Sequence, residues 1–156
     1  MSIRKRVDDA VFLWNHNRHE GAFLSALIAV AATSRRQFPN QGDRQAFEGF
    51  LKQGVFERIS VEYRGEIYPV YHIFYKWFRC QLVHEGGLPI DVQFMPEGKP
   101  GTVSIRAGGA PEYILKVSYG WFHELIHSVV HAPINADLFD DANTGEPIAE
   151  PCPTAG

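Results

Sequence analysis

Residues Tyr71–Gly87, YHIFYKWFRCQLVHEGG, combine a long helical pattern with an arginine and a histidine near its end. Pro69 suits the first turn of a helix and Gly86-Gly87 its end, which predicts a helix of about four turns. At 100° per residue, apolar side chains cover most of its circumference. The helix is therefore expected to be buried on most sides. Its apolar residues include Val70, Ile73, Phe74, Trp77, Phe78 and Cys80, and its polar strip contains His72, Lys76 and Arg79.

The arginine and the histidine of this stretch are Arg79 and His84, five positions apart. On a regular helix that spacing separates them by roughly 140° and about 7.5 Å, and it places His84 over the apolar side near Ile73 and Trp77. A histidine that belongs only to a solvated face would not be expected there.

The segment FRCQLVHEG, residues 78–86, resembles the arginine, four residues, histidine signature of HEPN domains, which are helical bundles and in many cases metal-independent ribonucleases. The earlier segment HNRHEGAFLSALIAVAATSRR, residues 16–36, is similar to the alanine-rich early helices of that superfamily. The resemblance covers Val7–Gly87, with a weaker match to the C-terminal helix. One departure is Cys80, because active members commonly carry a polar residue after the arginine.

The resemblance implies that Arg79 and His84 are catalytic, that RNA is the substrate and that no cofactor is needed. A histidine can take the proton of a ribose 2′-OH, and an arginine can bind the phosphate and stabilise its developing charge. It also implies a homodimer in which both chains build one groove, and an antitoxin or defence partner in the cytoplasm. The expected substrate-binding residues are Lys76, Glu85, His16 and Arg18.

A structural interpretation of the same residues stays open. His84 can be a helix-end histidine favoured by the helix dipole, and Arg79 an ordinary partner of Glu85 or Glu48. The chain would then be a non-catalytic helical interaction or ligand-sensing module. Cys80 and the net charge of −3 favour that alternative.

A second motif, His123-Glu124-Leu125-Ile126-His127, matches the HExxH pattern of zinc peptidases. On a helix, His123, His127 and His131 form one stripe that could hold zinc, with Glu124 as general base and Asp137 as another possible ligand. The apolar residues of this segment cover about 180°, which is equally typical of an amphipathic surface helix. We therefore expect no zinc here, and the zinc peptidase remains the second alternative.

The composition of the 156 residues, 45% of them hydrophobic, fits one globular domain, expected over 1–139. The longest apolar run, Ala26–Ala32, is too short for a membrane span, and two cysteines do not suggest a disulfide framework. The net charge of −3 argues against a strongly basic nucleic-acid binder, so any RNA site must be local. Residues 140–156 are expected to be a disordered tail.

The rest of the chain predicts a predominantly helical α+β fold: a helical bundle with a small antiparallel β-meander before the last helix. Helical spacing recurs at Arg4–Trp14, Glu20–Arg36, Arg44–Gln53 with Asp43 as N-cap, and Tyr119–His131 with Ser118 as cap. Alternating patterns predict strands at Ile90–Phe94, Thr102–Arg106 and Tyr113–Val117. The segment around Arg64-Gly65 fits a small hairpin and an irregular loop equally well.

Overall fold

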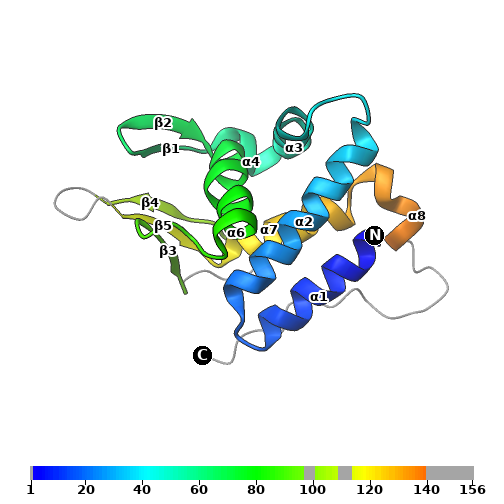
Figure 1. The fold of residues 1–156 in the computed structure, drawn as a ribbon, viewed down its shortest axis with the longest axis horizontal. Coiled ribbons are helices and arrows are strands. Elements are labelled where there is room, and N and C mark those ends of the chain that lie inside the picture. Colours follow the sequence, from blue (N-terminus) through cyan, green and yellow to red (C-terminus); the bar gives the residue numbers. More distant parts are fainter. Residues whose placement is uncertain (1, 97–100, 109–113, 140–156) are drawn as a thin grey trace.

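The computed structural model describes residues 2–96, 101–108 and 114–139, and it shows a predominantly helical α+β fold (Figure 1). The predicted tail 140–156 lies outside the described residues. The helices are α1 Ile3–Asn15, α2 His19–Gln37, α3 Asp43–Leu51, α4 Gly54–Arg58, α5 Val70–Ile73, α6 Cys80–Glu85, α7 Gly120–Val130 and α8 Ala136–Phe139, with a π-helix η1 Phe74–Arg79 and a 3-10 helix η2 Pro133–Asn135. The strands are β1 Ser60–Tyr63, β2 Glu66–Pro69, β3 Val92–Met95, β4 Ile105–Ala107 and β5 Leu115–Ser118.

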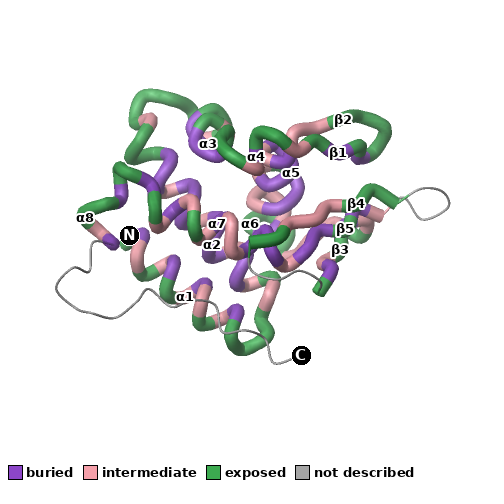
Figure 2. The backbone as a smooth tube through the Cα atoms, turned by 180° about the vertical axis from the view of Figure 1, so that it is seen from behind, coloured by how far each residue is buried: buried purple, intermediate pink, exposed green. Residues whose placement is uncertain are grey.

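Helix α2 is the central element of the core, because it contacts α1, α3, α7 and η1 (Figures 1 and 2). Its alanines Ala22, Ala26 and Ala29 are fully buried, and their small side chains let neighbouring helices approach closely. The aromatic rings of Phe23 and Phe78 pack there with centroids 6.0 Å apart. The helix predicted over Glu20–Arg36 is thus confirmed, and the structure shows that it is the packing centre. Among the described residues, no helix is both long and apolar enough to cross a membrane.

Of the two alternatives left open for residues 59–68, a hairpin or an irregular loop, the structure has the β1–β2 hairpin, with Arg64 and Gly65 both at positive φ in its turn. The prediction of an antiparallel meander from the next three strands is only partly right. Strand β5 lies in the middle, antiparallel to β4 but parallel to β3, so the order is β3-β5-β4. Alternation marks which segments are strands but does not encode their neighbours. Strand β5 takes the centre because Leu115, Val117 and Ser118 are all buried.

The junction of β5 and α7 depends on a glycine. A Cβ atom at Gly120 would lie 1.8 Å from the carbonyl oxygen of Thr102, so only glycine permits this approach of the two backbones. Ser118, predicted as the helix cap, instead accepts a hydrogen bond through Oγ from the Ser104 amide at 2.8 Å. The N-cap residue is Tyr119. The segment before β4 is therefore fixed against the start of α7.

The residues after α7 are anchored to α2 by a buried amide. Asn135 Nδ2 donates to Thr33 Oγ1 at 2.9 Å and to the Val129 carbonyl at 3.0 Å, and its Oδ1 accepts from Arg36 at 3.1 Å. A buried side chain that satisfies both its donor and its acceptor groups specifies one arrangement of the elements it joins. Asn135 therefore secures η2 and α8 to the bundle.

Candidate functional site

Helices α5, η1 and α6 follow one another without a break as a single helix, hereafter the Arg79 helix, and its middle has π geometry. A π turn holds more residues than the 3.6 of an α-helix, so the side chains after it are rotated from a regular projection. Two predictions from that projection are wrong. His84, expected over the apolar side, lies after the π segment and is exposed. His72, expected on the polar strip, precedes the π segment and is 8% exposed, because its ring contacts Glu48 of α3 and Tyr68 of β2.

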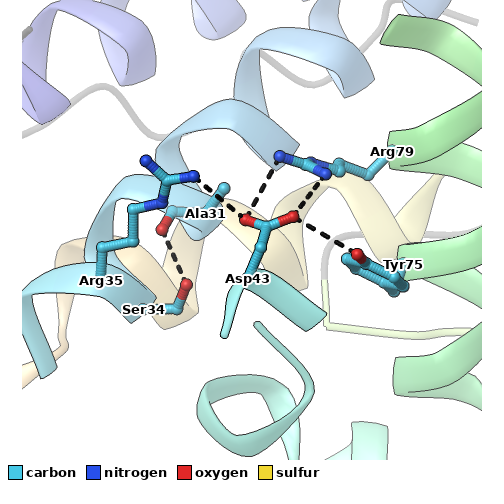
Figure 3. A network of polar contacts seen from close by, with 6 residues as sticks. All are labelled: Ala31, Ser34, Arg35, Asp43, Tyr75 and Arg79. Atoms are coloured by element: carbon cyan, nitrogen blue, oxygen red, sulfur yellow. Dashed lines mark hydrogen bonds and ion pairs between the residues drawn. The ribbon is translucent and has the colours of Figure 1, made fainter. Parts of the chain in front are cut away.

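Arg79 is fixed by Asp43 in the first turn of α3 (Figure 3). Arg79 Nη1 lies 2.7 Å from Asp43 Oδ2, and Nη2 lies 3.4 Å from Oδ1. The Tyr75 hydroxyl donates to Asp43 Oδ2 at 3.3 Å, and Arg35 at the end of α2 approaches Oδ1 at 3.5 Å. We call Asp43, Arg35, Tyr75 and Arg79 the Asp43 cluster. It joins three helices through one carboxylate, and the Arg79 side chain is 19% exposed.

The partner of Arg79 is thus neither Glu85 nor Glu48, which were the candidates from the sequence. Glu48 binds His72 instead, through Oε1 and Nδ1, and Arg44 lies 3.3 Å from Glu48 Oε2. The His72 ring stacks on Tyr68 with centroids 5.2 Å apart. Both carboxylates of α3 therefore bind basic groups of the Arg79 helix.

His84 lies beyond the π segment, exposed in the last turn of α6. Within the described part of the chain it makes no hydrogen bond, ion pair or ring contact. Because α6 is a regular helix, His84 points roughly 140° away from Arg79 and lies about 7.5 Å further along the axis. One chain therefore directs Arg79 toward α3 and His84 toward solvent, with Val83 beside it 48% exposed.

The four expected substrate-binding residues do not form one group. Lys76 is exposed with Nζ 4.7 Å from the Trp77 ring centroid, and Glu85 is exposed next to His84. His16 follows α1 and its Nδ1 is 2.7 Å from the Phe12 carbonyl. Arg18 is exposed in the α1–α2 turn, where it lines an open groove.

The two histidines of α7, His123 and His127, and its C-cap His131 separate into two environments. His123 is partly buried, with its ring centroid 5.4 Å from that of Trp14, and burial lowers its pKa. His127 and His131 are exposed, with ring centroids 4.2 Å apart. Asp137, the other possible ligand, binds Arg36 at 3.2 Å. In the described ranges no three side chains of the histidine, cysteine or carboxylate type are grouped to hold a metal.

Comparison with known proteins gives a family and little more. A family model described as Rv1289 matches residues 2–144, nearly the whole chain. The chain belongs to the Rv1289 family. Neither a curated protein nor a solved structure matches it. For this Rv1289 family member, the functional argument therefore depends on the geometry of the site.

Sequence reasoning identified Arg79 and His84 but missed the residues that bind Arg79. Asp43 was expected to cap α3, whereas the N-cap is Gly42 and the Asp43 side chain is free for the cluster. Tyr75 belongs to the helix that was expected to be apolar over most of its circumference, yet its hydroxyl donates a hydrogen bond to Asp43 and burial raises its pKa. The available signal was the pair of acids, Asp43 and Glu48, on one short helix.

Proposed function

We propose that this Rv1289 family member is a HEPN-like endoribonuclease that cleaves RNA without metal, at a site formed by Arg79 and His84 from two copies of the chain. The observation that carries the proposal is the contrast between the two side chains. Arg79 is pre-positioned by Asp43 and Tyr75, whereas His84 is exposed and without a partner in the described residues. An accessible imidazole can act as the general base of metal-independent cleavage, and a fixed guanidinium can stabilise the charge that develops on the phosphate.

Arg79 keeps donor groups for a phosphate although it binds Asp43. A guanidinium has five N–H donors in a planar fork, and the contacts to Asp43 use one on each Nη. The carboxylate prevents the long side chain from sampling other rotamers, so less entropy is lost when the phosphate binds. The proposed role of Asp43 is to position Arg79.

The chemistry is a phosphoryl transfer within the RNA. The His84 imidazole accepts the proton of a 2′-OH, the 2′-oxygen attacks the adjacent phosphorus, and the bond to the 5′-oxygen breaks. The leaving 5′-oxygen takes up a proton from water, and Arg79 stabilises the charge on the phosphate oxygens. The products are a 2′,3′-cyclic phosphate and a 5′-hydroxyl.

A second copy is proposed because one chain does not direct both groups toward one phosphate. The apolar residues of the Arg79 helix are covered more fully by its own bundle than the sequence suggested, so the main exposed apolar residue on it is Val83. Val83 and His84 lie side by side on α6. Pairing of two α6 helices would cover Val83 and bring His84 to the partner's arginine.

The proposal is tested by incubating untagged protein with single-stranded RNA in EDTA. We expect cleavage that leaves 2′,3′-cyclic phosphate ends, and a loss of about 10³-fold in His84→Ala. His127→Ala is the matched control, an exposed helical histidine whose loss leaves cleavage unchanged. Cleavage that requires added zinc and is lost in His123→Ala would contradict the proposal and favour metal-dependent chemistry.

A non-catalytic interaction or ligand-sensing module is the second candidate, and the same ion pair favours it. Asp43 neutralises the charge of Arg79, which weakens the attraction of Arg79 for a phosphate. Cys80 also stands where active HEPN proteins commonly have a polar residue. A stable dimer that is inert toward varied RNAs would support this candidate. For either function, the proposal includes a role in stress or defence and a location in the cytoplasm.

A further inference from the structure

An open groove of about 610 Å³ lies beside the α1–α2 turn. None of the residues that line it belongs to the Arg79 helix. Helices α1 and α2 form one side of it, and β3 together with the start of α7 forms the other. The residues that line it are Leu13, Asn17, Arg18, His19, Glu20, Gly21, Phe94 and Tyr119. Nothing in the proposed chemistry of Arg79 and His84 uses these residues, apart from the expectation that Arg18 contacts substrate.

Aromatic rings in the groove are partly exposed and rigidly supported. Phe94 and Tyr119 are half-buried, with centroids 6.0 Å apart. Behind Phe94 the fully buried Phe23 stacks at 4.6 Å, and His19 stacks on Tyr119 at 4.3 Å. The Tyr119 hydroxyl and His19 Nδ1 are also 3.2 Å apart. Rings fixed in this way lose little entropy on binding, which suits them to stack against a planar ligand.

The charged groups of the groove point to an anionic part of that ligand. Arg18 is exposed and has no hydrogen bond or ion pair from its side chain to the residues that the structure describes. Burial lowers the pKa of His19, which keeps the imidazole neutral at neutral pH, where it adds a stacking surface and no charge. Glu20 is the opposing group, an exposed acid next to the groove. Arginine beside aromatic rings is the combination that binds a phosphate and its base together.

We infer that this groove is a second RNA subsite, which takes one nucleotide of a single strand by stacking its base on Phe94, with Tyr119 inclined at 59° along the edge of the base, and by pairing its phosphate with Arg18. The inference rests on the proposed ribonuclease function, because it names the form of RNA that the protein takes. A single strand is required, since the bases of a duplex are stacked on each other and cannot reach the rings.

The first test uses His84→Ala as background, so that the probe stays intact, and a fluorescein-labelled single-stranded RNA of about 10 nucleotides. Fluorescence anisotropy should show that Arg18→Ala weakens binding roughly fivefold and lowers the slope of log K against log salt by about 0.7. Phe94→Leu, which keeps an apolar side chain without a π face, should weaken binding roughly fivefold as well. Glu20→Gln should strengthen binding about twofold, because a repulsive charge is removed.

Arg58→Ala is the control, an exposed arginine at the end of α4, far from the α1–α2 turn (Figure 1). It should leave affinity unchanged. Equal effects of Arg18→Ala and Arg58→Ala, or no effect of either, would overturn the subsite. A shift of the dimer equilibrium in Arg18→Ala with RNA affinity unchanged would overturn it too, in favour of a contact between copies of the chain.

The second test separates this inference from the proposed function. AMP titrated into labelled wild-type protein should shift the NMR signals of Phe94 and Tyr119, and Arg18→Ala should weaken that response. If AMP shifts these signals but no RNA is cleaved, the ribonuclease proposal fails and the nucleotide site stands. If RNA is cleaved but AMP leaves the signals unchanged, the groove is refuted and the ribonuclease proposal stands.

Discussion

Two clusters in this molecule each combine an aspartate with a tyrosine and arginine, but the first has one arginine, the second has two, and their geometry differs. In the first, Arg64 binds both oxygens of Asp91 at 2.8 Å, and Tyr63 donates to Asp91 at 2.7 Å. In the Asp43 cluster only one contact of Arg79 is that short, and the other contacts to the carboxylate are 3.3 to 3.5 Å. The first cluster saturates its carboxylate, whereas the second divides one carboxylate between two arginines.

This difference in geometry distinguishes the Arg64–Asp91 pair, which has a structural role, from the Asp43 cluster, which belongs to the candidate site. Arg64 is at positive φ in the β1–β2 turn, and its contacts to Asp91 connect the hairpin to the residues before β3. The hydrogen bond from Arg64 lowers the pKa of Asp91 to about 2, and burial raises the pKa of Tyr63. Arg79 is the last residue of the π segment, and exposed His84 follows on the same helix. An arginine and an aspartate alone therefore do not indicate function, and the neighbouring histidine makes the distinction.

The largest expected effect distinguishes the two arginines. Arg79→Ala should lower kcat/KM for RNA cleavage by about 10²- to 10³-fold, because a donor to the developing phosphate charge is lost. Arg64→Ala should leave kcat/KM unchanged, since no proposed catalytic group lies near the hairpin turn. Initial rates on one labelled RNA measure both. Equal losses of kcat/KM in Arg79→Ala and Arg64→Ala would contradict a specific role of Arg79 in cleavage.

A smaller effect is expected from the aspartates. Asp43→Asn should lower cleavage roughly tenfold, with the loss mainly in kcat, because the neutral amide positions Arg79 less firmly in the transition state. Asp43→Glu should recover part of that loss, and Asp91→Asn should leave the rate unchanged. Circular dichroism confirms that each variant is folded. Faster cleavage by Asp43→Asn would show instead that Asp43 competes with the phosphate.

The smallest effect concerns stability against acid. Because the folded pKa of Asp91 is about 2, below its ordinary 3.8, its ion pair stabilises the fold above about pH 4. That contribution is lost as the pH falls from about 4 to 2. The Arg64 side chain is 52% exposed, so solvent screening limits the contribution to about 1 kcal/mol. Urea unfolding should show this loss in wild type but not in Asp91→Asn, and identical acid profiles would contradict it.

The sequence predicted the fold class because most elements follow a regular period. Helix α7 is regular, and its buried residues Trp121, Phe122, Leu125 and Val129 follow the predicted apolar arc. The Arg79 helix was predicted over the correct residues, but the π segment was not, because its i→i+5 bonding leaves no period of its own in six residues. The orientation of His84, which follows the π segment, was wrong for that reason, whereas His72 precedes it and is buried by contacts with Glu48 and Tyr68. Strand order failed separately, since pairing partners are not encoded in alternation.

The candidate site was predictable only where its chemistry is local. Arg79 and His84 are five positions apart and carry a recognisable pattern, whereas Asp43 lies 36 positions from Arg79. The Asp43–Arg79 contact results from the packing of α3 against the Arg79 helix, and no local sequence motif predicts it. The groove at Arg18 combines residues from four elements, α1, α2, β3 and the start of α7, so its aromatic half was equally invisible from the sequence.

The central claim is that Arg79 and His84 act together across two copies of the chain, and mixing two inactive variants tests it most directly. Arg79→Ala and His84→Ala protein should each be inactive. After joint unfolding and refolding, mixed dimers place one intact arginine opposite one intact histidine, so a substantial part of the EDTA-resistant cleavage should return. Light scattering confirms that dimers form. Dimers that stay inactive after mixing, or a wild-type monomer that cleaves RNA, would contradict the composite site.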